Sequence, residues 1–165
     1  MFEFLKRPTN KNAIPQASPP VLNSDSEAAF GAPLNEFEQL LIAKHRKELD
    51  IYDFLDAFFN AKLGLLVPED QLDLSGGEPR LVQNPRLFSI IKPDANYLAF
   101  FSCAERAKPA MSRYPQYRHV ATVRAGDFIM SLHPGFGIVI NPYWDINFWW
   151  APDQVNDIRG IMKKP

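Results

Sequence analysis

Cysteine is nearly absent from this chain of 165 residues: Cys103 is the only one, so no disulfide can form within the molecule. Proteins of oxidising compartments commonly depend on disulfides, whereas thiols stay reduced in the cytosol. A chain of this length buries enough apolar surface to fold without a disulfide or a metal. We therefore expect a cytoplasmic protein.

Long apolar runs are missing as well. No stretch approaches the roughly 20 apolar residues that cross a bilayer. The first residues, MFEFLKRP, have neither the apolar segment nor the small-residue cleavage site of a secretory signal. The sequence therefore predicts no membrane partner.

Charge of one sign is not in excess, because 18 Lys and Arg residues stand against 19 Asp and Glu residues. Broad nucleic-acid binding needs a surplus of cations that neutralise phosphates. The basic run at residues 44–47 is followed at once by Glu48 and Asp50, which is typical of a solvated helix end. We expect no nucleic-acid partner.

The usual signatures of metal and cofactor sites do not occur. His45, His119 and His133 are far apart in the sequence, and there is no HxxxH or CxxC spacing. Residues 135–137 lack the third glycine of a dinucleotide fingerprint and precede a strand instead of a helix. The turn at residues 75–77 lacks the Lys and Ser or Thr of a phosphate loop. We expect neither a cofactor nor a metal.

Cys103 is the best enzymatic candidate. It stands at the start of a predicted helix, where the helix dipole and free N–H groups favour the thiolate. His119 or His133 would serve as its base if the fold brought either one close. Nothing in the spacing demands this, and the favoured interpretation of Cys103 is a small, partly buried residue at the first helical position. We expect no catalytic residue.

Two parts differ in composition. In residues 1–33, five prolines stand among Asn, Ser, Ala and Asp, a composition that buries too little apolar surface to offset the entropy cost of ordering the chain. We predict a flexible, proline-rich tail over residues 1–33 and a single folded domain over residues 34–165.

Helical patterns open and close the predicted domain. Asn35 can cap a first helix, with Glu38 completing a capping box. A second helix is predicted over residues 49–61, where apolar residues recur at the spacing of a buried stripe. A last helix starts at Pro152. Between them, Ser102 and Glu105 predict a capping box for a helix from Cys103 to about residue 112.

Short apolar segments lie between these helices. They predict strands at residues 65–67, 87–91, 97–101, 119–123, 137–140 and 148–150, with a helical turn at 126–133. Residues 97–101 are continuously apolar, as in a central strand covered on both faces. The expected fold class is α/β (α+β): a small mixed sheet flanked by helices, with an N-terminal helix pair and a C-terminal helix.

The aromatic segment at residues 135–152, GFGIVINPYWDINFWWAP, contains all three tryptophans. If Trp149 and Trp150 share a strand, they face opposite sides of the sheet. Exposed Trp and Tyr side chains are common anchors of protein interfaces. The predicted partner-binding residues are therefore Tyr143, Trp144, Asp145 and Phe148, with the loop from Asp73 to Glu78 as a second candidate.

Three segments together resemble the SseB protein N-terminal domain family: LGLLVP at residues 63–68, FFS at 100–102 with Glu105 beyond it, and GIVINP at 137–142. The likeness covers about residues 49–163. This chain has Phe101 where the family usually has Thr, and Tyr143-Trp144 where it has small residues. The resemblance implies a compact α/β fold in a bacterial cytosolic protein, with no established catalytic residues. It also implies a link with secretion systems and with small accessory or immunity genes.

The expected function is that of a non-enzymatic bacterial protein-binding module. In particular, we expect an immunity or accessory protein that binds and neutralises a secreted, secretion-system-linked toxin, so that the partner is a protein. Two alternatives stay open at this point. One is an RNA- or small-ligand-binding domain, and the other is an enzyme that uses Cys103 as its nucleophile.

Overall fold

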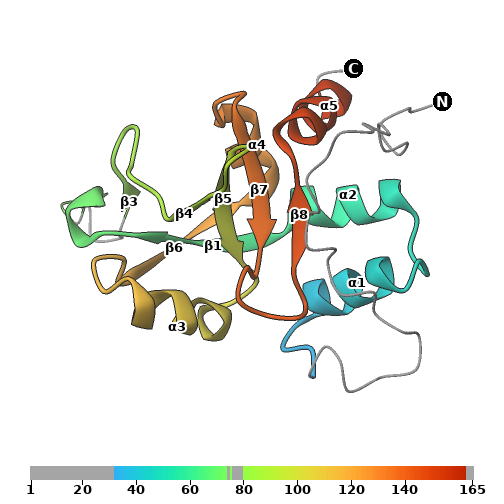
Figure 1. Ribbon diagram of the computed structural model, residues 1–165, viewed down its shortest axis with the longest axis horizontal. Coiled ribbons are helices and arrows are strands. Elements are labelled where there is room, and N and C mark those ends of the chain that lie inside the picture. Colours follow the sequence, from blue (N-terminus) through green and yellow to red (C-terminus); the bar gives the residue numbers. More distant parts are fainter. Residues whose placement is uncertain (1–31, 74, 76–79, 163–165) are drawn as a thin grey trace.

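The computed structural model of the protein describes residues 32–73, 75 and 80–162. Figure 1 shows helices around a central sheet. The helices are α1 (Glu36–His45), α2 (Ile51–Asn60), α3 (Ala104–Arg113), α4 (Ala125–Ser131), α5 (Pro152–Met162) and the short 3-10 helix η2 (Glu69–Gln71). The strands are β1 (Lys62–Val67), β2 (Leu72–Asp73), β3 (Arg80–Leu81), β4 (Ser89–Ile91), β5 (Asn96–Phe101), β6 (His119–Arg124), β7 (Phe136–Ile140) and β8 (Phe148–Trp150).

The main sheet has the strand order β6-β1-β5-β7-β8, and β4 pairs with β5 as its sixth strand. β5 and β7 run parallel, whereas the other neighbours in this sheet are antiparallel. β2 and β3 form a separate two-stranded hairpin. This mixed sheet, with its N-terminal helix pair and C-terminal helix, confirms the predicted α+β fold.

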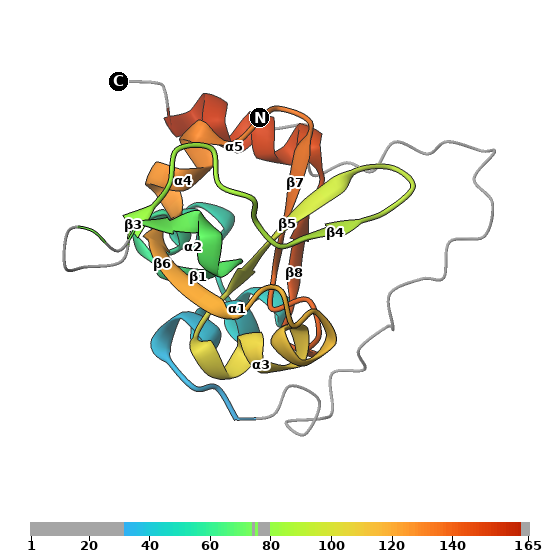
Figure 2. The same cartoon turned by 90° about the vertical axis from the view of Figure 1, so that its left-hand side faces the viewer.

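The sheet separates two apolar cores. Leu98 and Phe100 of β5 face a large core that includes residues of α1, α2, α4 and α5, whereas Ala99 and Phe101 face a smaller core beneath α3. α5 lies at the top and α3 at the bottom of both views (Figures 1 and 2). The prediction that β5 is covered on both faces is therefore confirmed.

The neighbouring tryptophans of β8 divide between these cores as predicted. Trp150 is buried in the large core, with its ring centroid 4.8 Å from that of Phe58. Trp149 packs against the smaller core beside Tyr97, with the Lys92 ammonium 3.7 Å from its ring centroid. Side chains of adjacent strand residues point to opposite faces, and this alone separates the two rings.

Two predicted strand boundaries were wrong. β1 starts at Lys62 instead of residue 65, because Gly64 lies inside the strand. A Cβ there would come 2.6 Å from Val120 Cγ1 of β6, so glycine permits this close strand contact. The segment predicted as a strand over 87–91 is also shorter, since only Ser89–Ile91 pairs with β5.

Each predicted helix boundary lies close to the observed one, but the predicted capping boxes do not form. The Asn35 side chain does cap α1 by accepting a hydrogen bond from the Glu38 N–H at 2.9 Å. The Glu38 carboxylate, however, accepts from the Leu34 N–H at 2.7 Å. Cys103, not Ser102, is the N-cap of α3, and Glu105 pairs with Lys108.

No helix in the described part of the chain has the length and apolar character needed to cross a membrane. The predicted tail, residues 1–33, falls outside the described residues except for its last two positions, so its flexibility stays a prediction.

Candidate functional site

The loop between β7 and β8 carries most of the predicted partner-binding residues. Tyr143 and Trp144 are half-buried and Asp145 is exposed, while Phe148 is half-buried at the start of β8. The structure therefore brings these four residues to one end of the sheet, although their side chains do not form one continuous surface.

Tyr143 and Phe148 belong to different cores. Tyr143 packs on the α3 side, with the Arg113 guanidinium 4.8 Å from its ring centroid. Burial, with a contribution from a hydrogen bond to Tyr114, raises the pKa of Tyr143 to about 12. Phe148 packs on the opposite side against Phe54, at 5.2 Å between ring centroids. Phe148 thus contributes to the packing of α2 on the sheet.

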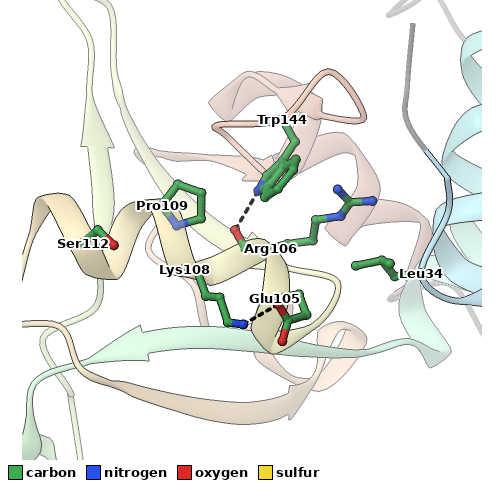
Figure 3. Close-up of a pocket in the computed structure, with 7 residues that line it drawn as sticks. All are labelled: Leu34, Glu105, Arg106, Lys108, Pro109, Ser112 and Trp144. Atoms are coloured by element: carbon green, nitrogen blue, oxygen red, sulfur yellow. Dashed lines mark hydrogen bonds and ion pairs between the residues drawn. The ribbon is translucent and has the colours of Figure 1, made fainter. Parts of the chain in front are cut away.

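Trp144 forms one wall of an open pocket of about 560 Å³. Figure 3 shows its indole standing over α3, with Pro109 on one side and Leu34 on the other. The indole N–H donates to the Arg106 carbonyl at 2.9 Å, and the Arg106 guanidinium lies 4.4 Å from the ring centroid. The remaining lining residues are Glu105, Lys108 and Ser112. We call this surface the α3 pocket.

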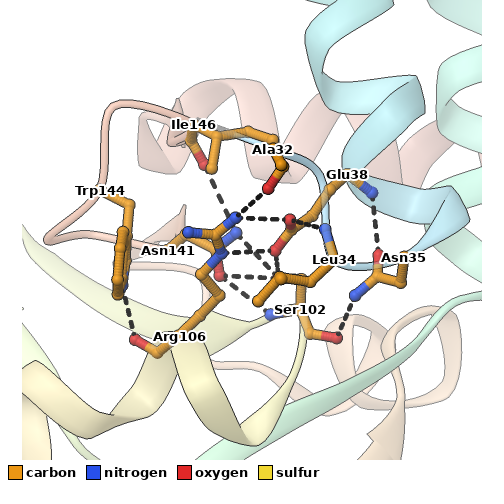
Figure 4. A network of polar contacts seen from close by, with 9 residues as sticks. All are labelled: Ala32, Leu34, Asn35, Glu38, Ser102, Arg106, Asn141, Trp144 and Ile146. Atoms are coloured by element: carbon orange, nitrogen blue, oxygen red, sulfur yellow. Dashed lines mark hydrogen bonds and ion pairs between the residues drawn. The ribbon is translucent and has the colours of Figure 1, made fainter. Parts of the chain in front are cut away.

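Arg106, which positions Trp144, is itself held by a buried ion pair. Its Nε and Nη2 donate to the two carboxylate oxygens of Glu38, at 2.8 and 2.7 Å. The side chains of Arg106 and Glu38 are only 5% and 0% exposed. A two-pronged bond between guanidinium and carboxylate fixes both the distance and the plane of the Arg106 side chain. α1 and α3 are therefore joined beneath the pocket (Figure 4).

Further donors surround the Glu38 carboxylate. The Ser102 hydroxyl and the Leu34 N–H also donate to it, and Arg106 donates in addition to the Ala32 carbonyl at 3.3 Å. Burial raises the pKa of Glu38, but hydrogen bonds from Arg106, Ser102 and Leu34 outweigh this effect and leave the pKa lowered. The Glu38 carboxylate is therefore ionised at neutral pH. Buried charges persist only when partners compensate them, and here Glu38 and Arg106 compensate each other.

Asn141 connects this ion pair to the sheet. Its backbone is left-handed, with φ of 50°, and its side chain is buried. Its Oδ1 accepts from the Ser102 N–H at 2.9 Å, while its Nδ2 donates to the Ser102 hydroxyl at 3.0 Å and to the Ile146 carbonyl at 3.4 Å. The ends of β5 and β7 are thereby tied to the loop that carries Trp144. We call Glu38, Ser102, Arg106 and Asn141 the anchor cluster.

The second predicted surface lies elsewhere. Asp73 ends β2 opposite Arg80, and hydrogen bonds from Ser75 hold its pKa below the ordinary value. Glu78 lies outside the described residues. The β2–β3 hairpin flanks β6, whereas the Trp144 loop leads into β8 at the opposite edge of the main sheet (Figure 1). The two candidate surfaces are therefore separate.

Cys103 is half-buried at the N-cap of α3, and its side chain forms no capping hydrogen bond. His133 accepts a hydrogen bond from the Gly135 N–H at 3.2 Å, and His45 bonds the Asn147 carbonyl. Within the part of the chain that the structure describes, no hydrogen bond joins Cys103 to a histidine, and no three His, Cys, Asp or Glu residues group as metal ligands.

The sequence predictions missed the anchor cluster. One signal was present: Glu38 lies three residues before Leu41 in the buried stripe of α1, a position where an unpaired charge is costly. Arg106 likewise precedes the buried Ala110 by four residues in α3. Such charges predict a buried partner, although they do not identify it.

The chain matches the family model described as SseB protein N-terminal domain over residues 38–157. That span begins at Glu38 and includes Ser102, Arg106 and Asn141, so the whole anchor cluster lies within it. No curated protein and no solved structure matches the chain.

Proposed function

Because the chain belongs to the SseB protein N-terminal domain family, we propose that it is a non-enzymatic protein-binding module whose contact surface is the α3 pocket. The observation that carries this proposal is the position of Trp144. Its half-buried ring is bonded to Arg106, which is itself locked by a buried carboxylate.

A ring held in this way is suited to recognition. Trp and Arg are enriched among the residues that dominate binding energy at protein interfaces. A side chain already fixed in place loses little conformational freedom when a partner binds, so more of its contact energy appears as affinity. Trp144 supplies the aromatic surface, while Leu34 and Pro109 extend the apolar wall.

The rim of the pocket supplies charge. Lys108 and Glu105 pair with each other, but their side chains are 65% and 61% exposed. An exposed pair of this kind contributes little to folding. Either side chain can therefore turn to a charge on a partner at small cost, which favours specificity and association rate.

The finer proposal is that the partner is a secreted bacterial toxin, which the chain binds and neutralises in the cytoplasm. The family resemblance to proteins linked with secretion systems and immunity genes supports it. An immunity protein acts by occupying its toxin, so a rigid complementary surface suffices for its function. Under this proposal, a substitution of Trp144 that abolishes binding of the toxin also abolishes protection of the cell.

Affinity capture from the native host tests the proposal, with nuclease treatment to remove RNA bridges. The wild-type chain is compared with Trp144→Ala, Lys108→Glu and the control Ile91→Ala, which removes a side chain that is 79% exposed on β4. We expect one protein to be recovered by wild type and control. Its affinity should fall about 30-fold with Trp144→Ala, which corresponds to about 2 kcal/mol.

The recovered protein is then expressed alone and together with the chain. Growth arrest that only the wild-type chain relieves would support the toxin proposal. If a folded Trp144→Ala variant and the Lys108→Glu variant each recovered as much of this protein as the wild-type chain does, the α3 pocket would be overturned as the contact surface. If the recovered protein is harmless when expressed alone but needs Trp144 for binding, the binding-module proposal stands and the immunity role is overturned.

A further inference from the structure

Among the described residues, β6 is an edge strand of the main sheet. β6 pairs with β1 along its whole length, from Val67–His119 to Lys62–Arg124. No other strand among the described residues pairs with β6. An exposed edge presents a row of backbone donors and acceptors to any extended chain that approaches it.

The register shows which backbone groups point outward. Ala125 N–H donates to the Ala61 carbonyl at 2.9 Å, which continues the β1–β6 register and marks a hydrogen-bonded pair. Bonded and non-bonded pairs alternate in antiparallel strands, so Ala121 and Val123 bond to β1. The N–H and C=O groups of Val120, Thr122 and Arg124 therefore point away from the sheet.

An independent bond agrees with this assignment. Leu66 lies opposite Val120, and its carbonyl accepts from the Phe88 N–H at 2.9 Å. Phe88 precedes β4 on the side of β1 away from β6. Because Leu66 bonds to that side, the Leu66–Val120 pair is one of the non-bonded pairs, as the register requires.

A groove of about 560 Å³ runs along this edge. Five consecutive residues of β6, 119–123, line it together with Leu72, Arg80 and Leu81 of the β2–β3 hairpin. Adjacent side chains of a strand point to opposite faces, so five consecutive residues can line one groove only along the strand's edge. The groove therefore reaches the outward backbone groups of Val120 and Thr122.

We propose that β6 is a strand-addition site that takes an extended, carboxylate-bearing segment of a partner protein. Main-chain hydrogen bonds to an exposed edge are an established mode of peptide recognition. Among the lining residues, Arg80 and His119 are the two that can carry positive charge, and none is acidic. Leu72 and Leu81 supply an apolar wall for alternate side chains of the added strand.

Selection from a phage-displayed library of random eight-residue peptides tests this proposal on the full chain. We expect the selected peptides to alternate β-branched residues with Asp or Glu. Thr122→Pro should weaken their binding at least 10-fold, because it removes an outward N–H but no bond to β1. The matched control, Thr122→Val, keeps the N–H and should bind like wild type, as should Trp144→Ala.

Three results would overturn the proposal: no selected peptide, equal binding of the selected peptides to a folded Thr122→Pro, or selection of basic peptides. Circular dichroism checks that Thr122→Pro is folded. As a second measure, Arg80→Glu leaves the backbone intact and should weaken binding of the selected peptides several-fold. A concentration-dependent dimer that Thr122→Pro abolishes would replace the partner protein with a second copy of this chain. Because Trp144 lies at the other edge, failure here leaves the α3 pocket unaffected.

Discussion

The anchor cluster and the segments that flank the β2–β3 hairpin each contain an arginine paired with a carboxylate, but in opposite surroundings. Glu38 and Arg106 are almost completely buried, whereas Asp70 and Arg86, beside the β2–β3 hairpin, are 62% and 66% exposed. The buried pair determines the positions of α1, α3 and the Trp144 loop. The exposed pair joins η2 to the segment before β4, and the hairpin that lies between them in the sequence lines the groove along β6. We propose rigid side-chain contact at the α3 pocket and backbone pairing at the β6 edge.

The largest expected effect comes from breaking the buried pair. Glu38→Ala leaves the Arg106 charge buried without its partner, and we expect the free energy of unfolding to fall by about 3–5 kcal/mol. Asp70→Ala should cost less than about 1 kcal/mol, because solvent screens the exposed pair. Urea denaturation of the two variants measures the difference.

A double variant sharpens this prediction. Glu38→Leu with Arg106→Met removes both charges, so we expect it to be more stable than Glu38→Ala. If the double variant were as unstable as the single one, the cost would come from lost packing instead of an uncompensated charge.

The next effect concerns two left-handed asparagines. Asn141 has φ of 50° within the anchor cluster, and Asn84 has φ of 54° on the exposed segment before β4. Asn84→Ala should cost about 1 kcal/mol, from backbone strain alone. Asn141→Ala should cost about 2–4 kcal/mol, since it also leaves the Ser102 N–H without its acceptor.

Asn141→Gly separates the two contributions to that loss. Glycine adopts the left-handed conformation freely but lacks the amide, so only the hydrogen-bond loss should remain. Equal stability of Asn141→Gly and wild type, measured by urea denaturation, would show that the Ser102 contact contributes nothing.

A smaller effect is expected from acid. The pKa of Glu38 is lowered in the folded state, so its contribution to stability is present above its ordinary value of 4.5. That contribution is lost as the pH falls from there through the folded pKa. The free energy of unfolding should therefore decline more steeply below pH 4.5 in wild type than in Glu38→Gln. Parallel curves from thermal unfolding at several pH values would contradict this.

The smallest effect is expected at Cys103. Its side chain forms no capping bond, and Ser is a favoured N-cap residue. We expect Cys103→Ser to leave partner capture unchanged and to raise stability by at most about 1 kcal/mol. Loss of every protective phenotype in this variant, with binding intact, would revive the enzymatic alternative.

Much of the fold was predictable because its signals are local. The stripe of Phe54, Leu55 and Phe58 identifies the buried face of α2, and the adjacent Trp149 and Trp150 divide between the two cores. Both patterns follow from backbone periodicity, which distant contacts do not alter.

The failures of prediction occurred where a distant contact outcompeted a local one. Ser102 and Glu105 have the spacing of a capping box, but the Ser102 hydroxyl donates to Glu38, 64 residues away. A buried carboxylate needs several donors, and satisfying it outweighs one half-buried helix cap. The predicted strand began after Gly64 because glycine is typical of strand ends. The reason for a small residue at this position is Val120 on the neighbouring strand, which the local sequence does not show.

The amino-acid sequence by itself determined the helices, most of the strands and the two-sided burial of the sheet, since each depends on residues within a few positions of one another. Only the tertiary structure decided that Glu38 meets Arg106, that the Trp144 ring is fixed above α3, and that β6 lies at an edge. The order of the strands and the pairing of Glu38 with Arg106, 68 residues away, depend on how whole elements pack. A local sequence pattern does not specify that packing.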